Sequence, residues 1–145
     1  MILAARNHVG LTRREINHCI RAWELLCGQN RRALIISEAH KHSSKTRFNE
    51  VDGRVYLGAD VKPGIGMEAN ARMSVLACLA HELAHVERFE GQIQRPIEFP
   101  DSLIDEAEAS LHASFMSVLN ERDRRDLIED ARDRLSQWFS ESRWE

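Results

Sequence analysis

The stretch from Ser74 to Phe89 is one of the least polar of the chain, yet it contains His81, Glu82 and His85. Its apolar residues predict a helix that is buried in the core. Side chains four positions apart project from the same face of a helix, so the two histidines point to one place. Two imidazoles and a carboxylate are unfavourable to bury unless they are paired or bound to a metal. The stretch therefore predicts a helix that carries a buried polar site.

Residues 81–85 form the motif H-E-x-x-H. Two imidazole nitrogens at this spacing can each reach one Zn²⁺ at about 2.0–2.1 Å. Glu82 lies about 100° around the helix from His81, close enough to act on a water without being a ligand. The motif predicts metal-assisted hydrolysis with His81 and His85 as zinc ligands and Glu82 as the general base. A chance match on a charged helix is the alternative, and the apolar flanks argue against it.

The whole chain narrows the class of protein. Its 145 residues fit a single domain over 1–145, without a linker or repeat. The net charge is −3, and arginines alternate with acidic residues over 121–126, so we expect no direct nucleic-acid contact. No apolar run approaches a membrane span, and the N-terminus does not resemble a signal peptide. Three cysteines without a C-x-x-C pair suit a reducing compartment. We expect a cytoplasmic protein.

Apolar residues at helical spacing predict four helices. They run from Thr12 to Gly28, from about 68 to 90, from Asp101 or Ser102 to about Leu119, and from Asn120 to beyond Trp138. Thr12 and Glu15 form a capping box, Gly91 stops the second helix, and Asn120 can cap the last.

Three short segments between the first two helices predict a sheet. Residues 33–36 are a short buried strand, and Asp52-Gly53 divides 45–51 from 54–61 in the manner of a tight hairpin. The predicted fold class is α+β. The expected order is a helix, a small three-stranded antiparallel sheet, the motif helix, a third helix and a C-terminal amphipathic helix.

A catalytic zinc needs a third protein ligand, and the helix after Asp101 holds the candidates. One face is strongly apolar: Ile104, Ala107, Leu111, Phe115 and Val118. Glu108 lies near the centre of that face and Glu106 roughly opposite, which favours Glu108. The opposite face is a stripe of small residues, with Glu106 at its N-terminal end: Ala109, Ser110, Ala113 and Ser117. This stripe allows another backbone to come close, so both glutamates stay candidates. Asp105 has a structural interpretation, because its negative charge would stabilise the N-terminus of this helix.

The run from His81 to His85, followed by Glu106-Ala-Glu-Ala109, resembles the gluzincin pattern of H-E-x-x-H and a later E-x-x-A helix. It looks most like the ImmA/IrrE-like metallopeptidases, over about residues 12–120. This resemblance implies that Glu106 is the third zinc ligand, beside His81 and His85, and that Glu82 is the base. It also implies a protein substrate such as a transcriptional regulator or an antitoxin.

Two further residues have competing interpretations. His112 could be a third ligand or could stabilise an oxyanion, but a hydrogen-bonded structural histidine is favoured. Cys78 lies one turn before His81 and is interpreted as a packing residue.

The leading functional hypothesis is a zinc metallopeptidase that binds its substrate along an edge of the sheet. The alternatives are a zinc-containing protein-interaction module without catalysis, and a hydrolase of small amides or esters. The sequence does not indicate an oligomeric state.

Overall fold

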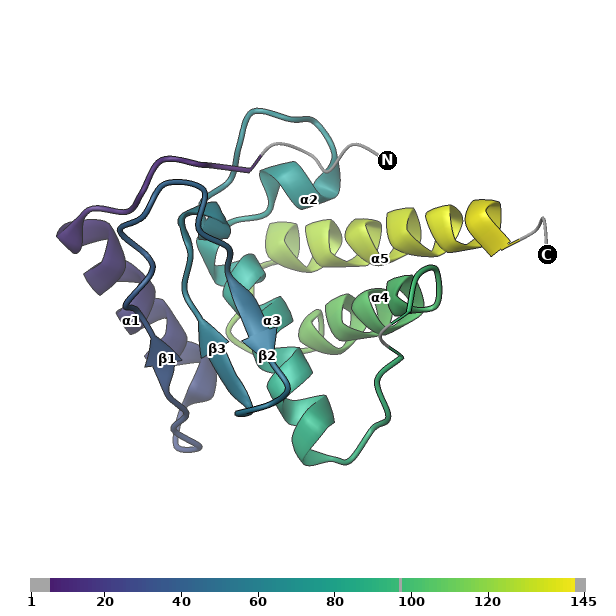
Figure 1. Ribbon diagram of the computed structural model, residues 1–145, viewed down its shortest axis with the longest axis horizontal. Helices are drawn as coiled ribbons and strands as arrows, with labels where there is room; N and C mark the ends of the chain where they lie inside the picture. Colours follow the sequence, from purple (N-terminus) through teal and green to yellow (C-terminus); the bar gives the residue numbers. More distant parts are fainter. Residues whose placement is uncertain (1–5, 97, 143–145) are drawn as a thin grey trace.

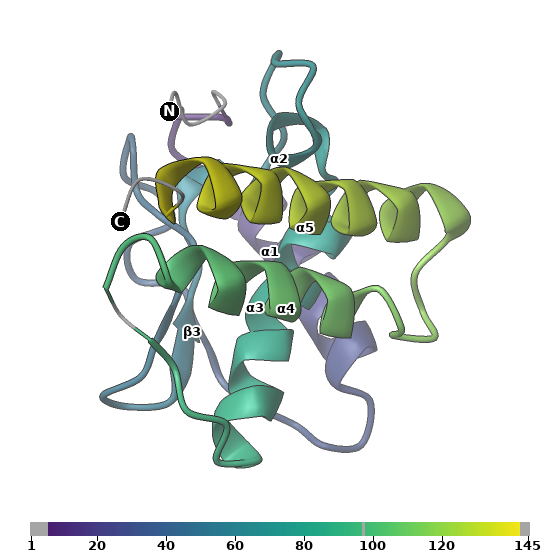
Figure 2. The same ribbon diagram turned by 90° about the vertical axis from the view of Figure 1, so that its right-hand side faces the viewer.

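The helix that carries the H-E-x-x-H motif lies at the centre of the molecule (Figure 1). The structure is a computed structural model that describes residues 6–96 and 98–142 and has an α+β fold. Helix α3 (Val75–Glu90) contacts α1 (Arg13–Cys27) on one side and both α4 (Ser102–Ala113) and α5 (Glu121–Ser142) on the other. Helices α4 and α5 lie side by side (Figure 2). The site predicted on α3 is therefore surrounded by the largest elements of the fold.

Helix α1 begins and ends where the local sequence predicts. The Glu15 N–H donates to Thr12 Oγ1 at 3.1 Å, and the Thr12 N–H donates to the Glu15 carboxylate at 2.9 Å. These bonds form the predicted capping box. Gly28 ends the helix at φ +60°, a left-handed conformation that glycine adopts without steric strain.

The sheet is mixed, so the prediction of an antiparallel sheet is wrong for one of its two pairings. β2 (Arg47–Asn49) and β3 (Arg54–Tyr56) form the predicted antiparallel hairpin, but β1 (Leu34–Ile35) runs parallel to β3 on its other edge. The segment between β1 and β2 explains the difference. It is itself packed, because Ala39 is fully buried and its carbonyl accepts the Leu11 N–H at 2.9 Å. This segment carries the chain to the far edge of the sheet before β2 begins.

The hairpin connection is longer than a two-residue turn. It covers residues 50–53, and the Gly53 N–H donates to the Asn49 carbonyl at 2.8 Å. Gly53 has φ +69°, which explains why glycine occupies this position. The strand predicted over 54–61 ends at Tyr56, and its last part forms the 3-10 helix η1 (Ala59–Val61).

The helix predicted over 68–90 is two helices. α2 (Ala69–Arg72) ends before Met73, whose ψ of 135° is not helical. Helix α3 begins after Ser74, whose Oγ accepts the Ala77 N–H at 3.1 Å. Serine is a strong N-cap because its side chain replaces a missing helical partner. As predicted, α3 ends at Gly91.

Helix α4 is shorter than predicted, because it ends at Ala113. Asp101 stands at its N-cap position, but its carboxylate accepts the Trp138 indole N–H at 3.1 Å instead of capping the helix. Asn120 caps α5 as predicted, since its Oδ1 accepts the Asp123 N–H at 2.8 Å.

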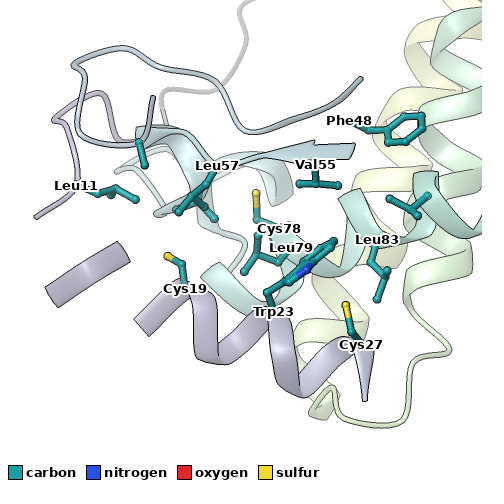
Figure 3. Packing of buried hydrophobic residues seen from close by; sticks show 13 residues of the cluster. Leu11, Cys19, Trp23, Cys27, Phe48, Val55, Leu57, Cys78, Leu79 and Leu83 are labelled. Carbon is teal, nitrogen blue, oxygen red and sulfur yellow. The ribbon is translucent and has the colours of Figure 1, made fainter. Parts of the chain in front are cut away.

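The main hydrophobic core lies between α1, α3 and the sheet (Figure 3). Trp23, Val55, Leu79 and Leu83 meet there, each at most 2% exposed. A second cluster joins α3 to α4 and α5 mainly through alanines: Ala77, Ala80, Ala84, Ala109 and Ala113. Helix α3 is thus packed on both sides, which holds its polar side chains in place. None of the described helices has the length and apolar character that a membrane crossing requires.

Candidate metal centre

His81, His85 and Glu106 come together between α3 and α4. The Nε2 atom of His81 lies 2.8 Å from Glu106 Oε1, and the Nε2 atom of His85 lies 3.0 Å from the same oxygen. One ligand atom of each residue lies within 4.8 Å of the others, a spacing at which the three could hold one metal ion. Two imidazole nitrogens and a carboxylate oxygen that converge in this way are a suitable donor set for such an ion.

Glu106, and not Glu108, reaches the histidines. The Glu108 side chain is 53% exposed and pairs with Arg88 at 2.9 Å. The reason is that α4 packs through its small residues: Ala109 and Ser110 are fully buried, whereas Leu111, on the strongly apolar face, is 38% exposed. The argument that favoured Glu108 is therefore wrong, because the face of small residues is buried as well and Glu106 reaches the histidines from its N-terminal end.

A buried chain of hydrogen bonds supports His81 from behind. Its Nδ1 atom lies 2.8 Å from Ser110 Oγ, and the Ser110 hydroxyl donates to Asp130 Oδ2 at 2.7 Å. Arg134 Nε donates to the same Asp130 oxygen at 2.8 Å. Ser110 comes from α4, and Asp130 and Arg134 come from α5, so the C-terminal helix contributes directly to the surroundings of His81.

His85 is held by an aromatic ring and an ion-pair network. The ring of Phe48 stacks on His85 with centroids 6.0 Å apart, and Asp105 Oδ2 lies 3.7 Å from His85 Nδ1. Asp105 is 3% exposed and accepts from Arg95 Nε at 2.9 Å. Arg95 also reaches Glu106 Oε2 at 3.4 Å. Asp105 lies in the first turn of α4, as predicted, but its main contacts are with these groups.

The Glu82 carboxylate lies beside the cluster without a hydrogen-bond partner among the described residues. Burial raises its pKa, and the charges of Glu106 and Asp60 raise it further, while His81 and His85 act in the opposite direction. A carboxyl group with a raised pKa holds a proton more readily than an ordinary glutamate does.

The opposite effect acts on Glu106. Burial alone would raise the pKa of its carboxyl, but the close contacts with His81 and His85 outweigh burial and hold that pKa well below its usual range. For His81, burial lowers the pKa, but the Glu106 carboxylate more than compensates and raises it. The cluster thus keeps a negative charge between two imidazoles.

The cluster opens into a cleft with a volume of about 930 Å³. The hairpin and α5 contribute to its walls through Thr46, Arg47, Phe48, Arg134, Gln137 and Glu141. A smaller hollow of about 350 Å³ shares Arg47, Phe48, Arg95 and Glu106 with it and extends past Asn49 to Val51. A groove therefore follows β2 beside the cluster.

His112 lies away from the cleft, and Cys78 lies between the core and the cleft. His112 Nε2 lies 2.9 Å from Glu87 Oε1 on the surface, as the structural interpretation predicted, and does not line the cleft. Cys78 belongs to the main core and also lines the cleft, and burial raises the pKa of its thiol to about 12. Cys19 and Cys27 are also buried and free.

The sequence interpretation missed the roles of Asp130, Arg134 and Arg95. One signal was available for Asp130: on the last helix it shares a face with Asp123, Asp126 and the apolar Leu127. Acidic residues on the buried face of an amphipathic helix require partners, and all three aspartates have them. Arg95 lies in an irregular connection, where no periodicity indicates its direction.

No protein-family model, curated protein or solved structure matches this chain. The resemblance to ImmA/IrrE-like metallopeptidases therefore stays a prediction.

Proposed function

We propose that this protein is a zinc-dependent metallopeptidase that hydrolyses a peptide bond in a protein partner. The observation that carries the proposal is the convergence of His81, His85 and Glu106 beside a buried carboxylate, Glu82, that has no hydrogen-bond partner among the described residues. The cluster also opens into a large cleft, so a substrate has access to it.

The donor set supports zinc as the metal. Two histidines and one glutamate are one of the known ligand sets of catalytic zinc, whereas structural zinc sites have four protein ligands. Among the described residues, no fourth histidine, cysteine or carboxylate joins the cluster. Zinc bound there would supply a Lewis acid that acidifies water and polarises a carbonyl group.

Glu82 is proposed as the general base. Because it is next to His81 in sequence and lines the same cleft, its carboxylate can take a proton from the attacking water. Its raised pKa helps it to retain that proton and to return it to the leaving amide nitrogen. A carboxylate already bound by an arginine would be a weaker base, and Glu82 has no such partner among the described residues.

The substrate is proposed to bind as an extended strand along β2. Within the described sheet β2 pairs only with β3, and the groove follows β2 past Thr46, Arg47 and Phe48. An extended peptide can add a strand to such an edge through main-chain hydrogen bonds, and this geometry favours a polypeptide over a small amide. The sequence resemblance adds the proposal that the partner is a transcriptional regulator or an antitoxin.

A zinc-containing interaction module is the second candidate. The observation that favours it is a set of exposed apolar side chains on α4, α5 and the segment between them: Leu111, Phe115, Ile128, Leu135 and Phe139. Exposed apolar patches of this kind mark interaction surfaces.

The deciding experiment compares wild type with Glu82→Gln and with a control, Glu87→Gln, on the same helix. Each protein is incubated with zinc and a proteome-derived peptide mixture, and new termini are identified by mass spectrometry. We expect all three to bind about one zinc, and Glu82→Gln to cleave about 10²–10⁴-fold more slowly than the other two. Equal cleavage by Glu82→Gln would refute the role of Glu82. Absence of cleavage by wild type would refute the peptidase and favour the interaction module.

A further inference from the structure

We infer that Ser110 and Asp130 are positioning residues that fix His81 in the tautomer with a proton on Nδ1, so that the lone pair of Nε2 faces the metal position. The inference rests on the zinc site of the proposed function. We call Ser110, Asp130 and Arg134 the relay. The inference assigns a role to helix α5, which supplies Asp130 and Arg134.

The direction of each hydrogen bond follows from proton counting. Asp130 Oδ2 is an acceptor, since it also accepts from Arg134 Nε at 2.8 Å. The Ser110 hydroxyl has one proton, and it donates that proton to Asp130 at 2.7 Å. Ser110 Oγ can then only accept from His81, 2.8 Å away, so His81 Nδ1 carries the proton.

The consequence appears on the other side of the ring. In a neutral imidazole with the proton on Nδ1, Nε2 has a lone pair, and it lies 2.8 Å from the Glu106 oxygen. Two acceptors repel at this distance unless a cation lies between them. The relay thus makes the pair of His81 and Glu106 complementary to a metal ion. The alternative is a second proton on Nε2, which would make the cluster a metal-free ion network.

The relay is rigid because it is buried. Ser110 is 0% exposed and Asp130 is 2% exposed, so water does not compete for their hydrogen bonds. Residues behind a metal-bound histidine typically change metal affinity by 10–100-fold when they are replaced.

The chain contains a matched control. Ser74 Oγ donates to Asp123 Oδ1 at 2.7 Å, the same distance and the same kind of bond between a buried aspartate of α5 and a serine. No hydrogen bond described in the structure joins this pair to the three cluster residues. Asp123→Asn therefore tests the loss of a buried aspartate charge on α5 without touching the relay.

The experiment uses the full chain and two readouts that need no substrate. The first is the zinc dissociation constant, measured by competition with a chromophoric chelator. We expect it to rise about 10–100-fold in Ser110→Ala and in Asp130→Asn, and to change less than about threefold in Asp123→Asn. The second is a ¹⁵N–¹H correlation spectrum of the histidine rings of zinc-loaded wild type. We expect His81 to carry its proton on Nδ1, and this measurement does not depend on the folding of any variant.

Two results would overturn the inference. One is an unchanged zinc dissociation constant in folded Ser110→Ala, and the other is a zinc-loaded protein in which the His81 ring has its proton on Nε2. Neither result would refute the peptidase, which is tested by cleavage. Conversely, intact zinc binding without cleavage by wild type would refute the peptidase and leave the relay in place.

Discussion

Zinc is expected to stabilise the fold because its proposed ligands come from two helices. His81 and His85 lie on α3 and Glu106 lies on α4, so an ion between them links two elements that the chain connects only through residues 91–101. At a free zinc concentration 100 times the dissociation constant, binding to the native state adds about 2.7 kcal/mol to the free energy of unfolding. For a chain of this size we expect the Tm to rise by roughly 10 °C over the value in excess chelator.

The two glutamates of α4 separate this effect from nonspecific stabilisation. Glu106→Ala removes a proposed ligand, so we expect this variant to have the same Tm with zinc and with EDTA. Glu108→Ala removes only the ion pair with Arg88, in which the Glu108 side chain is 53% exposed. Such a pair contributes about 0–1 kcal/mol, and this variant should keep the full zinc-dependent shift. Thermal denaturation followed by circular dichroism measures both. A zinc-dependent shift that persists in Glu106→Ala and disappears in Glu108→Ala would refute the assignment of the third ligand.

Two further predictions concern stability. Leu79→Ala, at a fully buried position between α1 and the sheet, should lower the free energy of unfolding by about 2–5 kcal/mol. Leu25→Ala, on α1 at 58% exposure, is its control, and equal losses in urea denaturation would contradict the described core. Burial raises the pKa of the Cys78 thiol from 9.0 to about 12, so its stabilising contribution is complete below pH 9 and declines as the pH rises toward 12. Ionisation of this thiol in the unfolded state should lower the free energy of unfolding by about 1.4 kcal/mol per pH unit above 9. When urea midpoints are compared between pH 8 and 10.5, Cys78→Ala should therefore show a shallower decline than wild type.

The helix boundaries that could be predicted are those set by side chains close in sequence. Thr12 and Glu15 complete a capping box, and Asn120 caps α5, because each contact lies within one turn of the chain. The break before α3 was available from the same rule. Ser74 stands next to the apolar run and is a strong N-cap, but the periodic pattern on both sides favoured one continuous helix.

The strand pairing could not be predicted in the same way. The turn around Gly53 indicates which strands form the hairpin, but the position of β1 depends on contacts distant in sequence. The segment between β1 and β2 packs through Ala39, whose carbonyl accepts the N–H of Leu11 just before the first turn of α1. Nothing in the alternation of polar and apolar residues within 33–36 records that contact, so the prediction that β1 runs antiparallel was wrong.

Glu106, the proposed third ligand, shows why amphipathicity misleads at a site of this kind. A helix normally buries its most apolar face, and for α4 that rule selects Glu108. Glu106 can meet two histidines on α3 only if the two helix backbones come close, and close approach requires small side chains at the contact. Ala109 and Ser110 provide them, and both are fully buried. Leu111, on the strongly apolar face of the same helix, is 38% exposed. The close helix contact that Glu106 needs therefore explains why α4 buries its small residues. Small residues one turn after a glutamate are the local signal of such a contact.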